Sequence, residues 1–264
     1  MTLRVAIEGV AFWASRLPGW ELAQAVIRGE RAPPETASAR PAPTLLAPTE
    51  RRRAPDTVAV ALEVAARACE AAARKPADLP SVFASTHGDT AISDYMCATL
   101  AATPALISPI KFHNSVHNAA AGYWSIGTGS LAPYTAITAS ECTFGVGLLE
   151  AATQAICERR AVLYVAFDIE SKGALATMAA SRGLLAAAVV LAPVSLHQQH
   201  RTMILTTETG SSLDPTPARS AAAALLADNA MAPCLPLFEV LAQASPRTVR
   251  LSLSGGTALN VQVN

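Results

Sequence analysis

The stretch TAITASECTFGVGLLEA, residues 135–151, places a cysteine between an apolar strand and a helix. β-Branched and apolar residues before Cys142 favour a strand, and the apolar spacing after it favours a helix. A thiol at a helix N-terminus is expected to have a lowered pKa, because the helix dipole and the free amides stabilise the thiolate. Gly145 and Gly147 would let another backbone approach closely. Cys142 is therefore either a nucleophile or a small buried residue at a strand-to-helix corner.

Strand and helix signals alternate on both sides of this corner. Alternating or continuous apolar runs predict strands, and apolar positions three and four residues apart predict helices. The expected strands are residues 3–10, 81–84, 134–139, 161–167, 185–191, 202–207, 248–253 and 258–263. The expected helices are residues 20–28, 56–74, 89–101, 117–126, 143–159, 218–228 and 235–244. Such alternation predicts a layered α/β fold.

The composition also suggests how the chain is divided. Residues 31–55 are rich in Pro, Ala, Thr and Arg, which predicts a long surface connection. The polar linker PVSLHQQH, residues 193–200, is followed by elements that look like a shorter copy of those before it. We therefore expect a single domain over 1–264, with an N-terminal half of 1–195 and an abbreviated C-terminal half of 196–264.

Charge and apolar runs exclude several classes of protein. Twenty basic and twenty acidic residues cancel, so no net field would attract nucleic acid or an anionic membrane. The longest apolar run, residues 183–193, is too short to span a bilayer. The first residues indicate a strand and not a signal peptide, so a cytoplasmic protein is expected.

No pattern in the sequence indicates a metal or another cofactor. The five cysteines are widely spread and contain no CxxC pair, which argues against disulfides and against a zinc site. His113 and His117 are four residues apart and would share a helical face, but no third ligand accompanies them. Asp168 and Glu170 lie two residues apart on one face at the end of a strand. They have no partner group with which they could divide the roles of general acid and general base.

The corner around Cys142 also resembles a known motif. ITASECTFGVG, residues 137–147, resembles the nucleophile elbow of β-ketoacyl-acyl carrier protein synthases, where a cysteine after a strand precedes Thr or Ser, a variable residue and Gly. Other segments resemble the family in the same order: RVAIEGVA (4–11), ERRRAPDTVAVALEVAARA (50–68), KFHNSVHNAAAGYWSI (111–126), VLYVAFDIE (162–170) and SLSGGTALNVQV (252–263). The resemblance implies a thiolase-like layered αβαβα fold with a complete first half and a shortened second half.

The second half departs from the family where the family's chemistry lies. A condensing synthase forms a thioester on its cysteine, and two histidines stabilise the carbanion that develops on decarboxylation. Ser254 stands where an aromatic gate residue normally precedes the final two glycines. The histidines of this chain match neither of the family's histidine motifs: His87, His113, His117, His197 and His200. The resemblance therefore implies a subunit without the decarboxylating machinery.

The resemblance also implies where a partner and a growing chain would bind. The segment 112–124 is expected at the synthase dimer interface. Tyr123 and Trp124 suit an interface core, although packing in the protein's own core explains them equally well. The expected binding residues are Phe112, His113, Asn114, His117, Asn118, Tyr123, Trp124, Phe144, Ser254, Gly255 and Gly256.

Arg51, Arg52 and Arg53 form the one concentrated basic run. Acyl carrier proteins are acidic, so this run could dock one through charge-assisted contacts. The alternative is an ordinary solvated face.

Three functional hypotheses follow. The first is a chain length factor of polyketide or aryl polyene biosynthesis, which pairs with a full-length β-ketoacyl synthase, meets its acyl carrier protein and shapes the acyl tunnel without condensing activity. The second is an acyltransferase or priming synthase that uses Cys142 as acyl acceptor. The third is a homodimeric thiolase-like binding protein.

Overall fold

The computed structural model describes residues 1–195, 200–210 and 213–264. Its centre is one nine-stranded sheet, in which β1 (Thr2–Ala14) pairs antiparallel with β6 (Leu185–Pro193) and with β7 (Arg201–Thr209). Beyond β6 lie β5 (Val162–Asp168), β3 (Ser81–Ala84) and the edge strand β4 (Tyr134–Ile137). Beyond β7 lie β9 (Thr257–Val263) and the other edge strand β8 (Arg247–Ser254), while β2 (Leu17–Pro18) pairs with β1.

The two parts of this sheet repeat one arrangement. In the first part, β6 lies between β1 and β5 and is antiparallel to both. In the second part, β9 lies between β7 and β8 and is antiparallel to both. In the described part of the second half, no strand corresponds to β3 or β4. This is the arrangement that a shortened copy would produce, and the division at residue 195 stays a prediction.

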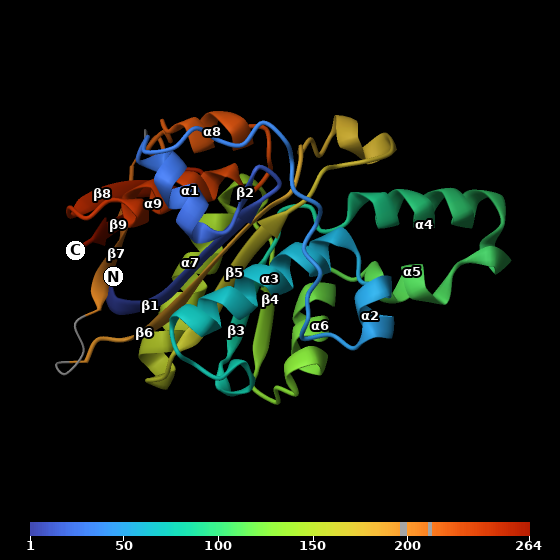
Figure 1. The fold of residues 1–264 in the computed structure, drawn as a ribbon, viewed down its shortest axis with the longest axis horizontal. Helices are drawn as coiled ribbons and strands as arrows, with labels where there is room; N and C mark the ends of the chain where they lie inside the picture. Colours follow the sequence, from blue (N-terminus) through green and yellow to red (C-terminus); the bar gives the residue numbers. More distant parts are fainter. Residues whose placement is uncertain (196–199, 211–212) are drawn as a thin grey trace.

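Helices cover the two faces of the first part of the sheet (Figure 1). On one face, α3 (Asp56–Ala71) and α6 (Ala119–Thr128) bury their apolar sides in a core that includes Phe83 and Trp124. On the other face, α7 (Thr143–Glu158) lies in a core with α1 (Trp20–Ile27), α8 (Ala221–Leu226) and α9 (Leu235–Ala242). This second core also contains residues of β7, β8 and β9, so it joins the two parts of the sheet.

The opposite face of the shorter part is polar. The core under α3 and α6 contains no residue of β7, β8 or β9. Glu208 accepts a 2.6 Å hydrogen bond from Asn260 and lies 3.2 Å from the Arg250 guanidinium across these strands. Polar side chains form hydrogen bonds with one another on this face. A polar face is expected where one side of an antiparallel sheet is exposed to water.

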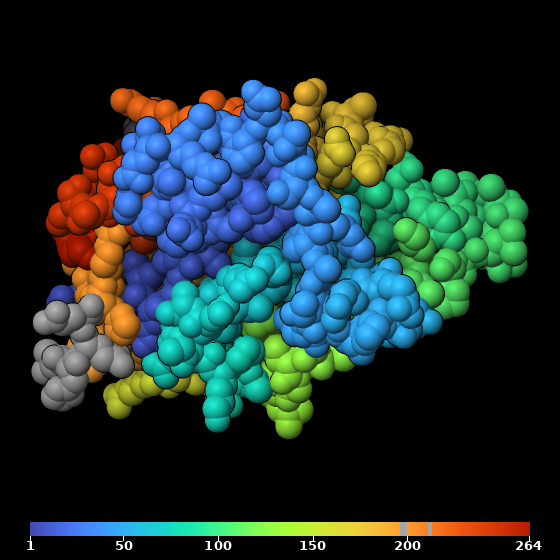
Figure 2. Space-filling model, in the orientation of Figure 1, coloured from blue at the N-terminus to red at the C-terminus, as the bar shows by residue number. Residues whose placement is uncertain are grey.

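An arm projects from the body at one end of the molecule. It consists of α4 (Thr90–Ala102), a short turn and α5 (Pro109–Asn114), and it extends away from the sheet in Figures 1 and 2. Only Thr90 and Ile92 of α4 are buried. Most of this helix is therefore not held by the packing of the body.

The predicted strands and helices are confirmed with small shifts at their ends. Two short helices were not predicted. One is α5, and the other is α2 (Pro48–Arg53), which lies within the expected surface connection 31–55. None of the helices in the described part of the chain has the length and apolar character that a membrane crossing requires.

Candidate functional site

The corner that contains Cys142 is a tight turn between β4 and α7. A single 3₁₀ turn, Ser140–Cys142, connects them, and Ser140 has a positive φ of 51°. The buried Thr143 hydroxyl accepts a hydrogen bond from the Ala139 amide at 2.9 Å and donates to the Ser140 carbonyl at 2.6 Å. The turn is therefore fixed by a side chain of the first helical residue.

Cys142 lies at the predicted helix N-terminus, but its thiol is not activated there. Its side chain is half-buried, and burial raises the pKa of the thiol, with a further rise from the adjacent Glu141 carboxylate. The expectation of a lowered pKa is therefore wrong. Within the described residues, no side-chain hydrogen bond to the Cys142 sulfur is present.

Two of the histidines have contacts with residues other than Cys142. His117 makes a 2.9 Å hydrogen bond through Nε2 to the Ser85 carbonyl, at the end of β3. His113 is exposed and stacks edge-on against Tyr123. His197, another of the histidines named above, lies outside the described residues. Over the described ranges, no group of three potential ligands could hold a metal ion.

The glycines after Cys142 do allow close approach. A side chain at Gly145 would collide with the Ser252 carbonyl oxygen of β8, and one at Gly147 would lie 2.7 Å from the Tyr164 ring. Phe144 is buried, stacks against Tyr164 and accepts a 2.7 Å hydrogen bond from its hydroxyl through the backbone carbonyl. Phe144 therefore packs in the core of the chain, and its place in a binding site stays a prediction.

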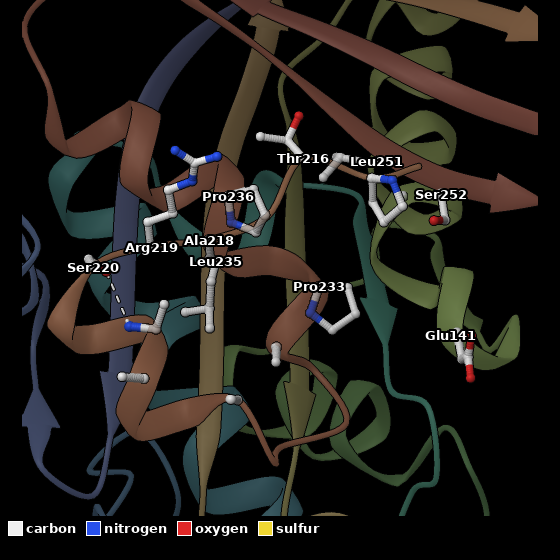
Figure 3. Close-up of a pocket in the computed structure, with 16 residues that line it drawn as sticks. Glu141, Thr216, Ala218, Arg219, Ser220, Pro233, Leu235, Pro236, Leu251 and Ser252 are labelled. Atoms are coloured by element: carbon white, nitrogen blue, oxygen red, sulfur yellow. Dashed lines mark hydrogen bonds between the residues drawn. The ribbon is translucent and has the colours of Figure 1, made fainter. Parts of the chain in front are cut away.

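A cavity of about 520 Å³ lies beside this corner (Figure 3). Glu141 and Gly145 border it on the side of α7, and Leu251 and Ser252 border it on the side of β8. The remaining lining comes from α8, from the start of α9 and from the segment 215–220. Most of the lining side chains are apolar, and the sequence reasoning did not anticipate this cavity.

Ser254, Gly255 and Gly256 form an exposed turn between β8 and β9. Gly256 has a positive φ of 76°, and its carbonyl accepts a 3.1 Å hydrogen bond from the Gly210 amide. A positive φ favours glycine because it has no Cβ. The glycines thus shape a turn at the end of the sheet.

The segment 112–124 separates into surface and core residues. Phe112 is 61% exposed, whereas Tyr123 and Trp124 are 3% and 1% exposed. The interface assignment of these two aromatic residues is therefore wrong, and the alternative of core packing is confirmed. Asn114 is also buried and accepts a 3.1 Å hydrogen bond from the Tyr123 hydroxyl.

Asn118 lies on the surface beside the edge strand. Its side-chain amide donates a 3.1 Å hydrogen bond to the hydroxyl of Tyr134, the first residue of β4. This contact ties the start of α6 to the edge of the sheet.

The three consecutive arginines are not equivalent. Arg51 donates to the carbonyl oxygens of Thr44 and Leu46 at 3.1 and 2.9 Å, so its head group stabilises the loop before α2. Arg53 lies 3.7 Å from Glu50 in an ion pair. Arg52 makes one long contact, 3.4 Å, to the Thr49 hydroxyl. The arginines therefore do not present three free cations to an acidic partner.

Asp168 has a structural role that the sequence reasoning did not assign to it. It ends β5, is fully buried and accepts hydrogen bonds from the Ser85 hydroxyl and from the amides of Thr86 and His87. Burial raises the pKa of its carboxyl, and these hydrogen bonds oppose that rise. The loop that leads into the arm is thus attached to β5. An acidic residue at the end of a wholly apolar strand was the available signal.

The chain belongs to the β-ketoacyl synthase family, because the family model for the N-terminal domain matches residues 23–235. Among curated proteins, none matches the sequence. The structure is similar to a chain of the complex of ketosynthase ApeO with its chain length factor ApeC from Xenorhabdus doucetiae. The identity is 18% and the TM-score 0.72, over 98% of this chain and 99% of that chain.

Two further solved structures are similar over their whole length. The ishigamide ketosynthase/chain length factor is 13% identical with a TM-score of 0.72, covering 99% of each chain. The AntDE:AntF complex, a type II acyl carrier protein with its ketosynthase, is 11% identical with a TM-score of 0.75, covering 100% of this chain and 99% of that one. The chain therefore has the thiolase-like layered α/β fold, with the second half shortened, as predicted.

Proposed function

We propose that this chain is a non-condensing, ketosynthase-like subunit of the chain length factor type. It pairs with a full-length β-ketoacyl synthase and forms one wall of the tunnel that holds the growing acyl or polyene chain. The observation that carries the proposal is the unpaired edge of β4, which lies next to a surface rich in exposed apolar side chains.

The two edges of the sheet differ in how they are protected. At β8, the Thr216 amide donates a 2.9 Å hydrogen bond to the Arg250 carbonyl oxygen. The Arg250 amide in turn donates a 2.8 Å hydrogen bond to the Thr216 hydroxyl. At β4, the one strand partner in the described chain is β3. An unprotected edge strand offers free N–H and C=O groups to another chain. This supports pairing of a partner subunit along β4.

Apolar side chains are concentrated on the same side of the molecule. Twelve large apolar side chains of the described residues are exposed, and eight of them lie between residues 100 and 134, on the arm, on α6 and around β4. They are Leu100, Leu106, Ile110, Phe112, Val116, Ile126, Leu131 and Tyr134. Such a concentration is typical of a protein interface.

The chemistry around Cys142 favours a non-catalytic role. Its thiol has a raised pKa, and no base contacts it among the described residues. Acyl transfer needs a thiolate or a neighbouring base to generate one. No observation therefore favours the acyltransferase or priming synthase hypothesis.

The known complexes also support a partner subunit. In the ApeO/ApeC structure a ketosynthase is bound to its chain length factor, and in AntDE:AntF an acyl carrier protein is bound to its ketosynthase. By analogy, an acyl carrier protein would meet the assembled pair. The arginine cluster contributes chiefly through Arg52, because Arg51 and Arg53 are already engaged.

Copurification tests the proposal. The tagged chain is isolated from its own host, and proteins that come with it are identified by mass spectrometry with their stoichiometry. We expect a full-length ketosynthase in a one-to-one ratio. A chain that returns alone as a stable homodimer would contradict the proposal and favour the homodimeric binding protein.

Surface variants locate the interface. Leu131→Asp and Ile126→Asp introduce charges beside β4, where a partner would bury them, so recovery of the ketosynthase should fall about tenfold or more. Val194→Asp changes an exposed apolar residue at the end of β6 and serves as the matched control. Equal recovery with all three variants would place the interface elsewhere.

A further inference from the structure

A second cavity lies where the shortened half of the sheet ends. In the first half, β5 has β3 as its outer neighbour. The strand β8 holds the corresponding place in the second half, and it has no outer strand in the described chain. The segment 216–220 lies there instead, joined to β8 by the hydrogen bonds between Thr216 and Arg250. About 430 Å³ stays open between this segment, α9 and the start of β8.

This cavity is separate from the one beside Cys142. It is lined by the last residues of α1 and α9 and by the first residues of β8, and none of its lining residues belongs to α7. The segment 216–220 and Pro236 form the wall between the two cavities. Three buried apolar side chains, Ile27, Val240 and Val249, contribute to the lining. The cavity is therefore partly apolar and large enough for a small molecule.

Two arginines give the lining an excess of positive charge. Arg219 extends past the Pro236 ring in Figure 3, and Arg247 lies on the same face of β8 as Val249, the face that α9 covers. Within the described part of the chain, no carboxylate lies in ion-pair range of either guanidinium. With Glu239 as the third charged residue, the lining has two positive charges and one negative charge.

The negative charge of Glu239 is already engaged. Its Oε1 accepts the backbone amides of Arg219 and Ser220 at 2.8 and 2.6 Å. These hydrogen bonds fix the segment that carries Arg219. They also place backbone N–H dipoles against the carboxylate, which lowers its effect on the rest of the cavity.

Two further donors without a partner border the cavity. The Gln243 side-chain amide forms no hydrogen bond with the described residues, although the Gln243 carbonyl accepts one from Arg201. The Arg250 amide and carbonyl point away from β9, toward Thr216. In an antiparallel strand the backbone groups two residues apart point to the same side, so the Thr248 amide also points to this edge. The cavity thus combines two cations with two neutral N–H donors.

We propose that this cavity binds the phosphate group of a small phosphate ester. The guanidinium groups of Arg219 and Arg247 bind the phosphate oxygens, and the amides of Gln243 and Thr248 donate to them as well. Phosphate suits this donor set better than carboxylate does, because it has three terminal oxygens in place of two. The buried apolar side chains contact the organic part of the ester. The proposal goes beyond the proposed function, since it concerns a ligand of this chain alone.

The test is isothermal titration calorimetry of the full chain with phenyl phosphate in a buffer of low ionic strength. We expect saturable binding at one site per chain, and weaker binding of benzoate. Arg219→Gln and Arg247→Gln should each weaken binding of phenyl phosphate about fivefold, because each removes one exposed cation. Arg182→Gln is the matched control. Arg182 is also exposed and without an ion pair in the described chain, but it lies outside the lining.

A variant with the opposite expected effect completes the test. Glu239→Gln removes the negative charge and keeps an oxygen that can accept the amides of Arg219 and Ser220, so binding should strengthen about threefold. Thermal melts of each variant confirm that it is folded.

Three outcomes would overturn the proposal. The first is the absence of saturable binding. The second is an equal loss with Arg182→Gln, which would indicate a general effect of surface charge. The third is binding of benzoate as tight as that of phenyl phosphate, which would exclude a preference for phosphate. Since no partner is added, a negative result here leaves the copurification result unaffected.

Discussion

Ser85 donates a 2.8 Å hydrogen bond from its hydroxyl to Asp168, and this bond joins the end of β3 to the end of β5. The same carboxylate accepts the amides of Thr86 and His87 at 2.9 and 3.1 Å. Asp168→Ala would leave these buried donors without a partner, so we expect a loss of about 3 kcal/mol in the free energy of unfolding. Urea denaturation followed by circular dichroism measures it. Asp94→Ala, on the exposed arm, should cost clearly less.

The stability of the protein should also depend on the charge of Asp168. Burial raises its pKa in the folded chain above the ordinary value of 3.8, so the folded state holds a proton over a pH range where the unfolded chain has lost it. The contribution of this group is fully present below pH 3.8 and is lost as the pH rises through the folded pKa. Relative to Asp168→Asn, the unaltered chain should therefore lose stability as the pH rises from 3.8. A constant difference between the two chains would contradict this.

The close approach of α7 and β8 makes Gly145 irreplaceable. A methyl group there would collide with the Ser252 carbonyl oxygen, a backbone atom that cannot rotate away. We expect Gly145→Ala to destabilise the protein by about 2 kcal/mol or more, measured by thermal melting. Gly122→Ala is the matched control, since nothing lies within 4 Å of its added methyl group in helix α6. It should stabilise the helix by about 0.5–1 kcal/mol.

Arg74 pairs with a carboxylate that is otherwise buried. The Glu8 side chain is 3% exposed and accepts two hydrogen bonds from Arg74, at 2.8 and 2.7 Å. Arg74→Gln would leave this charge buried without a cation, and we expect a loss of about 1–2 kcal/mol in unfolding free energy. Arg67→Gln breaks exposed ion pairs on α3 and should change stability by about 0.5 kcal/mol or less. Equal losses would show that burial of Glu8 has no effect.

The five thiols should react in an order set by burial. Cys97 and Cys157 are exposed, whereas burial raises the pKa of Cys69 to about 12 and the pKa of Cys234 further. Cys142 is half-buried with a raised pKa. Iodoacetamide at neutral pH, followed by peptide mass spectrometry, should therefore label Cys97 and Cys157 before Cys142. Labelling of Cys142 first would revive the acyltransferase hypothesis.

Sequence patterns predicted most of the body because its elements are long and their apolar positions regular. The strand β6, the strand β5, which is apolar up to Phe167, and the amphipathic helix α3 were located to within a few residues. The helices α2 and α5 were missed because each has six residues and begins with proline, a residue that more often marks a connection.

The candidate site was harder to predict because tertiary contacts determine it. The position of Cys142 at a helix start could be read from local sequence, but its raised pKa depends on burial. The partners of Asp168 lie more than 80 residues away along the chain, beyond the reach of any local pattern. Likewise, Tyr123 and Trp124 are residue types that are common in interface cores. In the structure both are buried against β3 and α3, a contact that the local sequence does not show.

The unequal edges of the sheet set a limit on assembly. Strand-to-strand growth can continue only when each added chain brings a second free edge. In the described chain, Thr216 forms hydrogen bonds with the backbone amide and carbonyl of Arg250 on β8. The edge at β4 has no such cover and is the one available for pairing. Pairing along β4, as proposed, would leave an outer edge that is covered at Arg250, which would favour discrete pairs over fibres.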